Sequence, residues 1–487
     1  MNNNTHNILS IILSEFNKGN KKIALLKMKE YLKKNPDDKE ARFDLAYMYV
    51  KLNLTNEAIS EYQIILKKTK DLQAMFNLAI CFSSLNNFSK SEKLLKKIIR
   101  IDKSHFKAYR ALGDIYFNLK KLEKASKFLN LARKLIPYDP VLLNLLGALE
   151  MKKGNYENSE KYFLASIKNK KDYKSAFNNL AALYQKTGKI NESLIIFNEL
   201  LLKFPEDPNL LNNIGNVLID LNRYKDSIKH LKKAIVINSS QSSFFSNLGR
   251  ALFFCKKYKE AKYFLNQSLK LNSHNYEAHL MFFYLFIMEK NFNNAWKFFN
   301  SRLHVKNYFI PYNLSLLRNI KNKKILVLRE AGLGDEILYS SMYRELINKN
   351  NNIVIECDYR LKAIFKRSFN FNSFISKSLT LRKKSNLAKF DLSIYAGSLS
   401  NYFRKNLSDF NYKNYLKPNT KYAEYYKKKL RKINQLPKIG ISWISTRLDL
   451  GKDKSIELEQ LLPILKRKNL SFVNLQYGDF TKKINDF

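Results

Sequence analysis

Cysteine and long apolar runs are scarce in this sequence, and each shortage excludes a class of protein. The three cysteines, Cys81, Cys255 and Cys357, lie far apart, which fits neither a disulfide framework nor a metal site and indicates a reducing compartment. The most apolar run, residues 280–288, is far shorter than the ~20 residues that a membrane-spanning helix needs. The first residues lack the basic start, apolar core and cleavage site of a secretory signal. We therefore expect a soluble, cytoplasmic protein.

Acidic residues are also scarce, since 42 Asp and Glu stand against 87 Lys and Arg and give a formal net charge of +45. Such an excess normally points to nucleic acid, an acidic membrane or another polyanion. However, the lysines are spread along the whole chain. Lys, Asn, Ile, Phe and Tyr are all abundant, and adenine- and thymine-rich codons encode these residues. We favour coding bias over a dedicated polyanion site, so a nucleic-acid partner is not expected.

The chain has 487 residues, too many for one ordinary domain, and a regular spacing occupies its first part. Alanine or serine recurs every 33 or 34 residues, and a second register of alanine or glycine lies twelve residues before seven of these positions. The first register is Ala24, Ala58, Ser91, Ala125, Ser159, Ser193, Ser227, Ala261 and Ala295. The second register is Ala46, Ala79, Gly113, Gly147, Ala181, Gly215 and Gly249.

Small residues at two fixed places let two antiparallel helices approach closely. Pro36, Pro137 and Pro205 each follow a first-register residue by twelve positions, where a helix should end. Aromatic residues are expected to fill the space between the helices, namely Tyr116, Phe163, Tyr184 and Tyr263. In its period and its small residues the array resembles the tetratricopeptide repeat, which implies a right-handed superhelix with a concave groove.

One repeat position, two residues before the second register, is occupied by asparagine in four repeats: Asn77, Asn179, Asn213 and Asn247. In the arrays that this sequence resembles, that position faces the groove. In O-linked N-acetylglucosamine transferases an asparagine ladder there holds the backbone of an extended protein substrate, because an amide can both donate and accept. The resemblance thus implies a protein or peptide partner in the groove. The alternative is that these asparagines are ordinary repeat consensus in an asparagine-rich protein.

Beyond about residue 323 the pattern changes to strands alternating with helices. Strands are expected at 325–328, 353–357, 390–395, 439–443 and 472–476, and helices at 359–368, 422–433 and 455–468, the last opened by Ser455. This alternation predicts a doubly wound parallel sheet, an α/β fold following the α-helical array.

The first of these strands ends in a glycine turn, with a helix expected from Glu336. Gly332 and Gly334 stand where the backbone must turn sharply or lie close to a ligand. A strand, a glycine turn and a helix start together favour anion binding at the carboxyl edge of a sheet. A single unit of this kind occurs in many folds, so the alternative is a purely structural turn.

Five stretches of this part carry a second resemblance: ILVLREAGLGDEILYSSM, IVIECDYRLKAIFKRSF, FDLSIYAGSL, PKIGISW and FVNLQYGD. After a repeat array, their succession resembles the bacterial repeat-linked glycosyltransferases. These are similar to the O-linked N-acetylglucosamine transferase and heptosyltransferase families, which have the GT-B fold of two Rossmann-like halves. The resemblance implies sugar transfer with inversion from a nucleotide-sugar donor to a protein or glycan acceptor. It implies no metal and no other cofactor.

The resemblance also implies roles for individual residues. In heptosyltransferase-like enzymes the Gly-Asp after the first strand lies at the acceptor, which carries onto Gly334 and Asp335. An inverting transfer needs a base near the acceptor oxygen, and no histidine follows His304, so the base is a carboxylate or comes from the repeats. Asp335 is the candidate base, and capping of the helix is its alternative role.

Other residues of the candidate site have lesser parts. Glu330 and the pair Glu356 and Asp358 also stand at strand ends, and Gly332 and Glu330 are expected at the substrate. For the leaving diphosphate, the resemblance places hydroxyl and basic groups in the turn after 439–443, with an exposed loop as the alternative. These residues are Ser442, Ser445, Thr446 and Arg447.

The expected domains are a repeat superhelix over 1–307, a connector over 308–323, an acceptor-side Rossmann-like half over 324–436 and the start of a donor-side half over 437–487. The last segment has room for only two strands and one helix, whereas the resembling enzymes continue through the rest of the donor half. We favour truncation over loss of donor binding or completion in trans, and do not expect the chain as given to be a competent enzyme. The competing class is a non-enzymatic scaffold in which the repeats recruit partner proteins.

Overall fold

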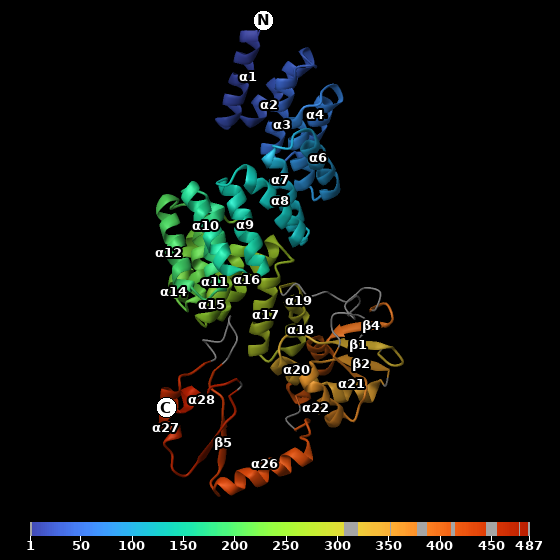
Figure 1. Cartoon of the computed structure of the whole chain (residues 1–487), viewed down its shortest axis with the longest axis vertical. Coiled ribbons are helices and arrows are strands. Elements are labelled where there is room, and N and C mark those ends of the chain that lie inside the picture. Colours follow the sequence, from blue (N-terminus) through green and yellow to red (C-terminus); the bar gives the residue numbers. More distant parts are fainter. Residues whose placement is uncertain are drawn as a thin grey trace. The chain divides into compact units, whose positions relative to one another are not determined.

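The computed structural model describes residues 2–305, 320–350, 352–376, 387–410, 414–444, 455–476 and 478–485. Residues 308–319 of the connector expected at 308–323 lie outside the described residues. The chain divides into two compact units, Met1–Leu200 and Leu201–Phe487, and each is described by itself. Figure 1 labels the helices and strands and colours them by residue number.

The first unit consists of helices joined by short turns. Its helices are α1 (Asn2–Asn17), α2 (Lys21–Lys34), α3 (Lys39–Lys51), α4 (Thr55–Lys68), α5 (Leu72–Ser84), α6 (Phe88–Ile101), α7 (Phe106–Asn118), α8 (Leu122–Leu135), α9 (Pro140–Lys153), α10 (Tyr156–Asn169), α11 (Lys174–Lys186) and α12 (Ile190–Lys203). Helix α3 packs on α4, α5 on α6, α7 on α8 and α9 on α10, so each repeat is a helical hairpin.

Local sequence explains where these helices begin and turn. Asp38, Asp71 and Asp139 each precede a helix and accept a hydrogen bond from the backbone N–H of its third residue. The turn inside a hairpin needs one residue with positive φ, and Asn86 (58°) and Gly154 (88°) supply it. Both residue types tolerate this conformation better than most.

The two registers of small residues meet between the helices of each hairpin, as predicted. Ser159 Oγ donates to the carbonyl of Gly147 at 2.8 Å, and Ser91 Oγ donates in the same way to Ala79 at 2.7 Å. A Cβ added to Gly147 would lie 2.6 Å from the ring of Phe163, closer than real Cβ contacts come. Glycine therefore sets how closely α9 and α10 approach.

The second unit begins with further helical hairpins. Its helices are α13 (Pro208–Asp220), α14 (Tyr224–Ile237), α15 (Ser242–Phe254), α16 (Tyr258–Leu271), α17 (Tyr276–Met288), α18 (Phe292–Phe299) and α19 (Ser301–Val305). Gly215 on α13 and Gly249 on α15 repeat the close approach, against Leu231 and Leu265. In α17 the equivalent position is Phe283, whose ring lies 4.6 Å from that of Phe299.

A parallel sheet with strand order β3-β2-β1-β4 follows. Its strands are β1 (Ile325–Leu328), β2 (Ile353–Glu356), β3 (Phe374–Ile375) and β4 (Leu392–Tyr395). The associated helices are α20 (Leu333–Ser340), α21 (Tyr343–Lys349), α22 (Tyr359–Phe369), the short 3-10 helices η2 (Ala396–Leu399) and η3 (Leu407–Asp409), and α25 (Ser400–Phe403). β1 is buried along its whole length and pairs in register with Ile353 of β2 and Leu392 of β4.

The two faces of this sheet have different neighbours. Ile325 and Val327 share a core with Tyr343 of α21 and Phe365 of α22. Leu326 and Leu328 point to the opposite face, as strand alternation requires, and belong to a cluster with Leu303 of α19. The last helix of the repeat region therefore helps to cover a sheet face that would otherwise be exposed.

The remaining elements are α26 (Thr420–Ile433), β5 (Lys438–Ile441), α27 (Leu458–Leu465), β6 (Ser471–Asn474) and α28 (Thr481–Asn485). β5 and β6 pair in parallel as a separate two-stranded sheet. The sequence predicted a doubly wound parallel sheet after the helical array, and the structure shows a small parallel sheet there, with β5 and β6 paired apart from it. The GT-B arrangement of two complete halves stays a prediction.

Several sequence expectations need correction. Helix α20 begins at Leu333, three residues before Glu336, because Gly332 rather than a later residue takes the N-cap position. Helix α27 begins at Leu458 with Glu457 as its N-cap, so Ser455 does not open it. Two strands expected at 439–443 and 472–476 are each displaced toward the N-terminus: β5 ends at Ile441 and β6 at Asn474.

The aromatic residues expected between the helices divide into two groups. Phe163 and Tyr116 are buried, as predicted, and Tyr184 is partly buried. Tyr263 is 59% exposed, so its prediction as a filler between helices was wrong. It follows Ala261 by two residues, which on a helix points a side chain away from the face that Ala261 buries.

Candidate functional site

The turn after β1 has an unusual backbone, but not at its glycines. Ala331 has φ 61°, a left-handed conformation that alanine adopts at a cost of roughly 1–2 kcal/mol. Gly332 has φ −97°, and Gly334 would have open space around an added Cβ. The sharp turn expected from the glycines is therefore made by Ala331, while both glycines lie exposed on the outside of the turn.

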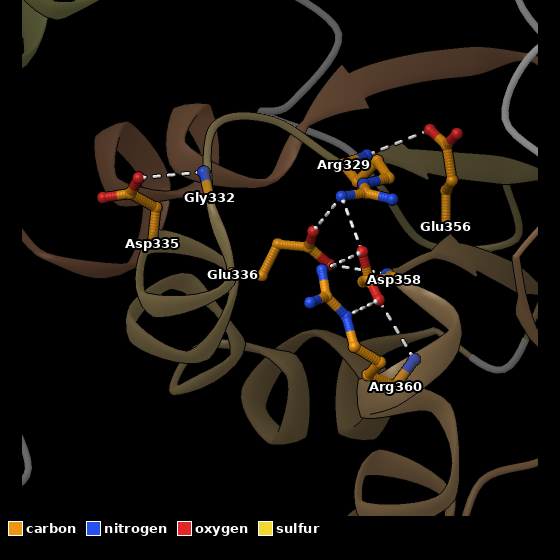
Figure 2. Close-up of polar contacts among 7 residues, drawn as sticks. All are labelled: Arg329, Gly332, Asp335, Glu336, Glu356, Asp358 and Arg360. Atoms are coloured by element: carbon orange, nitrogen blue, oxygen red, sulfur yellow. Dashed lines mark hydrogen bonds and ion pairs between the residues drawn. The ribbon is translucent and has the colours of Figure 1, made fainter. Parts of the chain in front are cut away.

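Asp335 lies in the first turn of α20, and its carboxylate faces back toward the turn (Figure 2). Its Oδ2 accepts a hydrogen bond from the backbone N–H of Gly332 at 3.1 Å. The capping role considered from the sequence is thus present in the structure. The side chain is partly exposed, so its position as an acceptor-side base stays a prediction.

Glu330 lies deeper than its place in a candidate site suggested. It is 4% exposed, and its two carboxylate oxygens accept from Arg302, Oε1 from Nη2 at 2.7 Å and Oε2 from Nε at 2.8 Å. Oε1 also accepts from the backbone N–H of Gly397 at 2.6 Å. Glu330 therefore joins three segments, α19, the turn after β1 and the start of η2.

A charged cluster lies at the carboxyl ends of β1 and β2 (Figure 2). Arg329 Nη2 lies 2.9 Å from Glu336 Oε1 and 3.2 Å from Asp358 Oδ2, and its backbone N–H donates to Glu356. Glu336 Oε2 also accepts from the backbone N–H of Asp358 at 2.8 Å. Arg360 completes the cluster through its Nε, 2.8 Å from Asp358 Oδ1.

The two acidic groups at the centre of this cluster have opposite pKa shifts. Burial raises the pKa of Glu336, whose side chain is almost fully enclosed. The hydrogen bond from Arg360 holds the pKa of Asp358 well below its usual range. Glu336 was not among the site residues predicted from the sequence. Its neighbour Asp335 was predicted instead, because Asp335 directly follows Gly334.

The turn predicted to hold a diphosphate is only partly within the described residues. Ser442 Oγ donates to Gln476 Oε1 at 3.2 Å, so its hydroxyl connects the ends of β5 and β6. The same oxygen of Gln476 accepts from the backbone N–H of Trp443 and of Ile444. Ser445, Thr446 and Arg447 lie outside the described residues.

The asparagines of the first helices make contacts between successive repeats. In the first unit, Asn179 Nδ2 donates to Asn144 Oδ1 at 2.9 Å. In the second unit, Asn247 Nδ2 donates to Asn212 Oδ1 at 2.9 Å. In both pairs the partners are 35 residues apart, so each amide pair joins one repeat to the next.

The other two asparagines of the predicted ladder are placed differently. Asn77 Nδ2 donates to the hydroxyl of Tyr62 at 3.2 Å, and its Oδ1 accepts from Gln73. Asn213 is partly exposed on α13, next to Asn212. Sequence reasoning missed Asn144 and Asn212, although both stand three residues before a register glycine, one position from the predicted ladder.

In the part of the chain that the structure describes, no group of three or more His, Cys, Asp or Glu is arranged to hold a metal ion. None of the described helices is both long and apolar enough to cross a membrane. Cys81, Cys255 and Cys357 are free thiols in the structure.

Two curated proteins are similar to part of this chain, and in each the match covers only part of that protein. Protein FlbA of Caulobacter vibrioides is 23% identical over 181 residues, which is 34% of this chain and 30% of FlbA. A TPR repeat-containing protein of Methanocaldococcus jannaschii is 26% identical over 163 residues, 33% of this chain and 28% of that protein. This chain thus spans less than a third of either relative.

Among solved structures, a chain of the APC/C hetero-tetramer Cut9–Hcn1 aligns with a TM-score of 0.43 and 20% identity, over 50% of this chain and 48% of that chain. A tetratricopeptide repeat protein from Parabacteroides merdae aligns with a TM-score of 0.41 and 15% identity, over 50% of this chain and 96% of that chain.

Tetratricopeptide repeat family models match residues 9–71, 72–105, 106–139, 141–173, 209–238 and 243–275. These matches end at residue 275, so the glycosyltransferase resemblance of the later part stays a prediction. The matched segments coincide with the helical hairpins and with the spacing of the small residues. From residue 9 to residue 275, this chain carries tetratricopeptide repeats.

Proposed function

We propose that this chain is a protein-interaction scaffold whose repeats hold an extended segment of a partner polypeptide. The observation that carries the proposal is the pair of inter-repeat amide contacts, Asn179 to Asn144 and Asn247 to Asn212. Such contacts fix the orientation of an amide that is still partly exposed. An amide that is already held in one orientation loses less rotamer entropy when a ligand binds to it.

The chemistry of the amide suits a peptide backbone. Each asparagine offers two N–H donors and a carbonyl acceptor, so one donated hydrogen bond leaves both kinds of group for a ligand. Asn179 and Asn247, the donors in the two pairs, are partly exposed, whereas Asn144 is 7% exposed. A peptide backbone presents N–H and C=O groups regardless of its sequence. We therefore expect recognition of an extended chain with little preference for particular side chains.

The sheet-containing part is held to the last repeat helices by several contacts. The indole N–H of Trp296 on α18 donates to the carbonyl of Arg404, and the rings of Phe292 and Phe410 lie 5.0 Å apart. The Arg302–Glu330 ion pair adds a third contact. A partner held by the repeats of this unit would accordingly be carried together with the sheet.

Selection of peptides from a random library against the whole chain tests the proposal. A selected peptide is then titrated against wild type and against Asn179→Ala/Asn247→Ala. A hydrogen bond contributes ~0.5–1.5 kcal/mol, so the double variant should weaken binding by roughly twofold to tenfold for each amide that the peptide contacts. The matched control is Asn130→Ala/Asn169→Ala, which removes two exposed amides from the second helices α8 and α10. Equal dissociation constants for the wild type and N179A/N247A would contradict the proposal.

Sugar transfer is a second candidate, favoured by one observation. The turn from Gly332 to Asp335 lies at the carboxyl end of β1 in a parallel sheet, the edge where such sheets bind ligands, and it is accessible. Against it stands the engagement of Asp335 in capping and of Glu330 in an ion pair. Calorimetric titration with a nucleoside-diphosphate sugar tests this candidate. For a glycosyltransferase, the expected result in a chain extended by a donor-side half is detectable donor binding that Asp335→Asn leaves intact, together with loss of transfer.

A further inference from the structure

Helix α26 presents an apolar stripe that nothing within the described residues covers. None of its residues is buried. Tyr422, Tyr425, Tyr426 and Ile433 are exposed by 64, 57, 54 and 64%. A single exposed aromatic residue is ordinary, but several on one helix face are not.

These side chains share one face because of their spacing. Relative to Tyr422 they stand at i+3, i+4 and i+11, and Leu430 adds i+8. At about 100° per residue, the five positions fall within an arc of about 140°. The helix is therefore amphipathic, although the part of the chain described offers no core for it to pack against.

The rest of the helix surface is strongly basic. Glu424 is its single acidic residue, against six cations: Lys421, Lys427, Lys428, Lys429, Arg431 and Lys432. Lys429 falls within the arc of the stripe, and its long stem can carry the ammonium to the edge. The partner of such a helix must supply both negative charge and an apolar layer beneath it.

We propose that α26 binds the surface of an anionic lipid bilayer and lies in the plane of the interface. A bilayer surface offers phosphates to the cations and acyl chains to the stripe, the combination that interfacial amphipathic helices use. Tyrosine suits this depth because its ring is apolar and its hydroxyl stays hydrated. The helix is only about 21 Å long at 1.5 Å per residue, so it lies on the bilayer and does not span it.

Nucleic acid fits the same helix less well. Phosphates of a nucleic acid would neutralise the cations, but they would leave Leu430 and Ile433 in water. The tyrosines could stack on unpaired bases, so single-stranded RNA is the competitor to test.

The test is co-sedimentation of the full chain with vesicles of phosphatidylcholine alone and of phosphatidylcholine mixed with phosphatidylglycerol. We expect binding to the mixed vesicles only, weakened by salt. Each cation near an anionic surface contributes about fivefold, so Lys427→Glu/Lys428→Glu should lower the partition coefficient at least tenfold. The matched control is Lys33→Glu/Lys34→Glu, two exposed lysines in the last turn of α2, which should change it less than about threefold.

A second variant separates an interfacial helix from charge attraction alone. Tyr426→Ser/Ile433→Ser keeps every cation and removes two apolar side chains from the stripe. Both residues are exposed, so the variants should melt as wild type does. Wild-type partitioning by Y426S/I433S would overturn the proposal, as would equal binding to both kinds of vesicle or to neither. Binding of a single-stranded RNA oligonucleotide, lost in K427E/K428E and without vesicle binding, would reassign the helix to nucleic acid.

Discussion

Arg302 and Glu330 form a buried, two-point ion pair between the last repeat helix and the turn after β1. Their side chains are 7% and 2% exposed, and Nη2 lies 2.7 Å from Oε1. Arg302 Nη2 also donates to Ser398 Oγ at 3.0 Å. Because both charges are enclosed and hydrogen-bonded, each depends on the other for compensation. The pair thus couples the repeats of this unit to its sheet.

Removing one partner of this pair should destabilise the second unit strongly. Glu330→Gln keeps an acceptor for Gly397 N–H but leaves the Arg302 charge uncompensated. Such a change typically lowers the free energy of unfolding by about 4 kcal/mol. Arg302→Met should cost a similar amount. The double variant R302M/E330Q removes both charges and should lose clearly less than the sum of the two single variants.

Urea unfolding followed by tryptophan fluorescence measures these changes. The chain has two tryptophans, Trp296 and Trp443, so a Trp443→Phe background leaves Trp296 as the reporter. The ring of Trp296 lies 5.4 Å from that of Phe299, over which the Arg302 guanidinium lies. Glu260→Gln serves as the control, because Glu260 pairs with Lys257 at 46% and 57% exposure. If the loss of stability in R302M/E330Q equals the sum of the losses in R302M and E330Q, the two charges do not compensate each other.

Phe163 should be the most sensitive of the aromatic residues expected between helices. It is fully buried opposite Gly147, whereas Tyr138 is 73% exposed. Phe163→Ala should destabilise its repeats by about 3–5 kcal/mol, and Tyr138→Ala by less than about 0.5 kcal/mol. Hydrogen exchange of the α9 and α10 amides is the measurement. Unchanged protection in F163A would contradict the packing described.

His279 should make the last repeat sensitive to acid. Burial lowers the pKa of His279, and the nearby His274 and His304 lower it further. A histidine with a lowered folded pKa contributes stability above its ordinary pKa of about 6.5, and this stability is lost as the pH falls through that value. His279 Nδ1 lies 3.1 Å from Ser301 Oγ on α19, so protonation would place a charge at the contact between α17 and α19.

The measurement is the urea midpoint of the Trp296 transition between about pH 5 and pH 8. His279→Gln retains a group that can bond Ser301 but cannot titrate, so its midpoint should fall less on acidification than that of the wild type. His230→Gln is the comparison variant, because burial also lowers the pKa of His230 on α14, and its share of the acid loss is then separated from that of His279. Parallel curves for wild type and H279Q would exclude His279 as the acid-sensitive group.

The repeats could be predicted from the sequence because the same spacing recurs. Ala181 and Gly147 are recognisable from their register, and packing between neighbouring hairpins follows from local sequence. β1 was predictable at its full length because four consecutive apolar residues are typical of a strand buried on both faces. β3, with only Phe374 and Ile375, has no such signal and was missed.

The candidate site was less predictable, because its contacts join residues far apart in sequence. Glu330 looked like a site residue at a strand end, but its partner Arg302 lies 28 positions earlier on a repeat helix. No local sequence pattern predicts an ion pair between residues so far apart. Ala331 has the left-handed backbone of the turn. Backbone propensity alone would have assigned this conformation to the neighbouring Gly332.

The last prediction distinguishes the two roles considered for Asp335. As a cap, its carboxylate compensates the backbone N–H of Gly332 and lies at the positive end of α20. Asp335→Ala should then lower the stability of the second unit by about 0.5–2 kcal/mol. Asp335→Asn retains an acceptor oxygen and should lose only a few tenths of a kcal/mol.

A base at the same position would respond differently. Asparagine cannot take a proton from an acceptor hydroxyl. In a chain extended by a donor-side half, D335N would therefore lose about 10²–10⁴-fold in transfer rate while its urea midpoint stayed near that of wild type. Comparing D335A with D335N in unfolding, and D335N with wild type in sugar transfer, therefore assigns the residue. If D335A unfolds as wild type does, the hydrogen bond to Gly332 contributes nothing to stability. If D335N transfers sugar within a fewfold of the wild-type rate, the base is another group, and the buried Glu336 becomes the next carboxylate to replace.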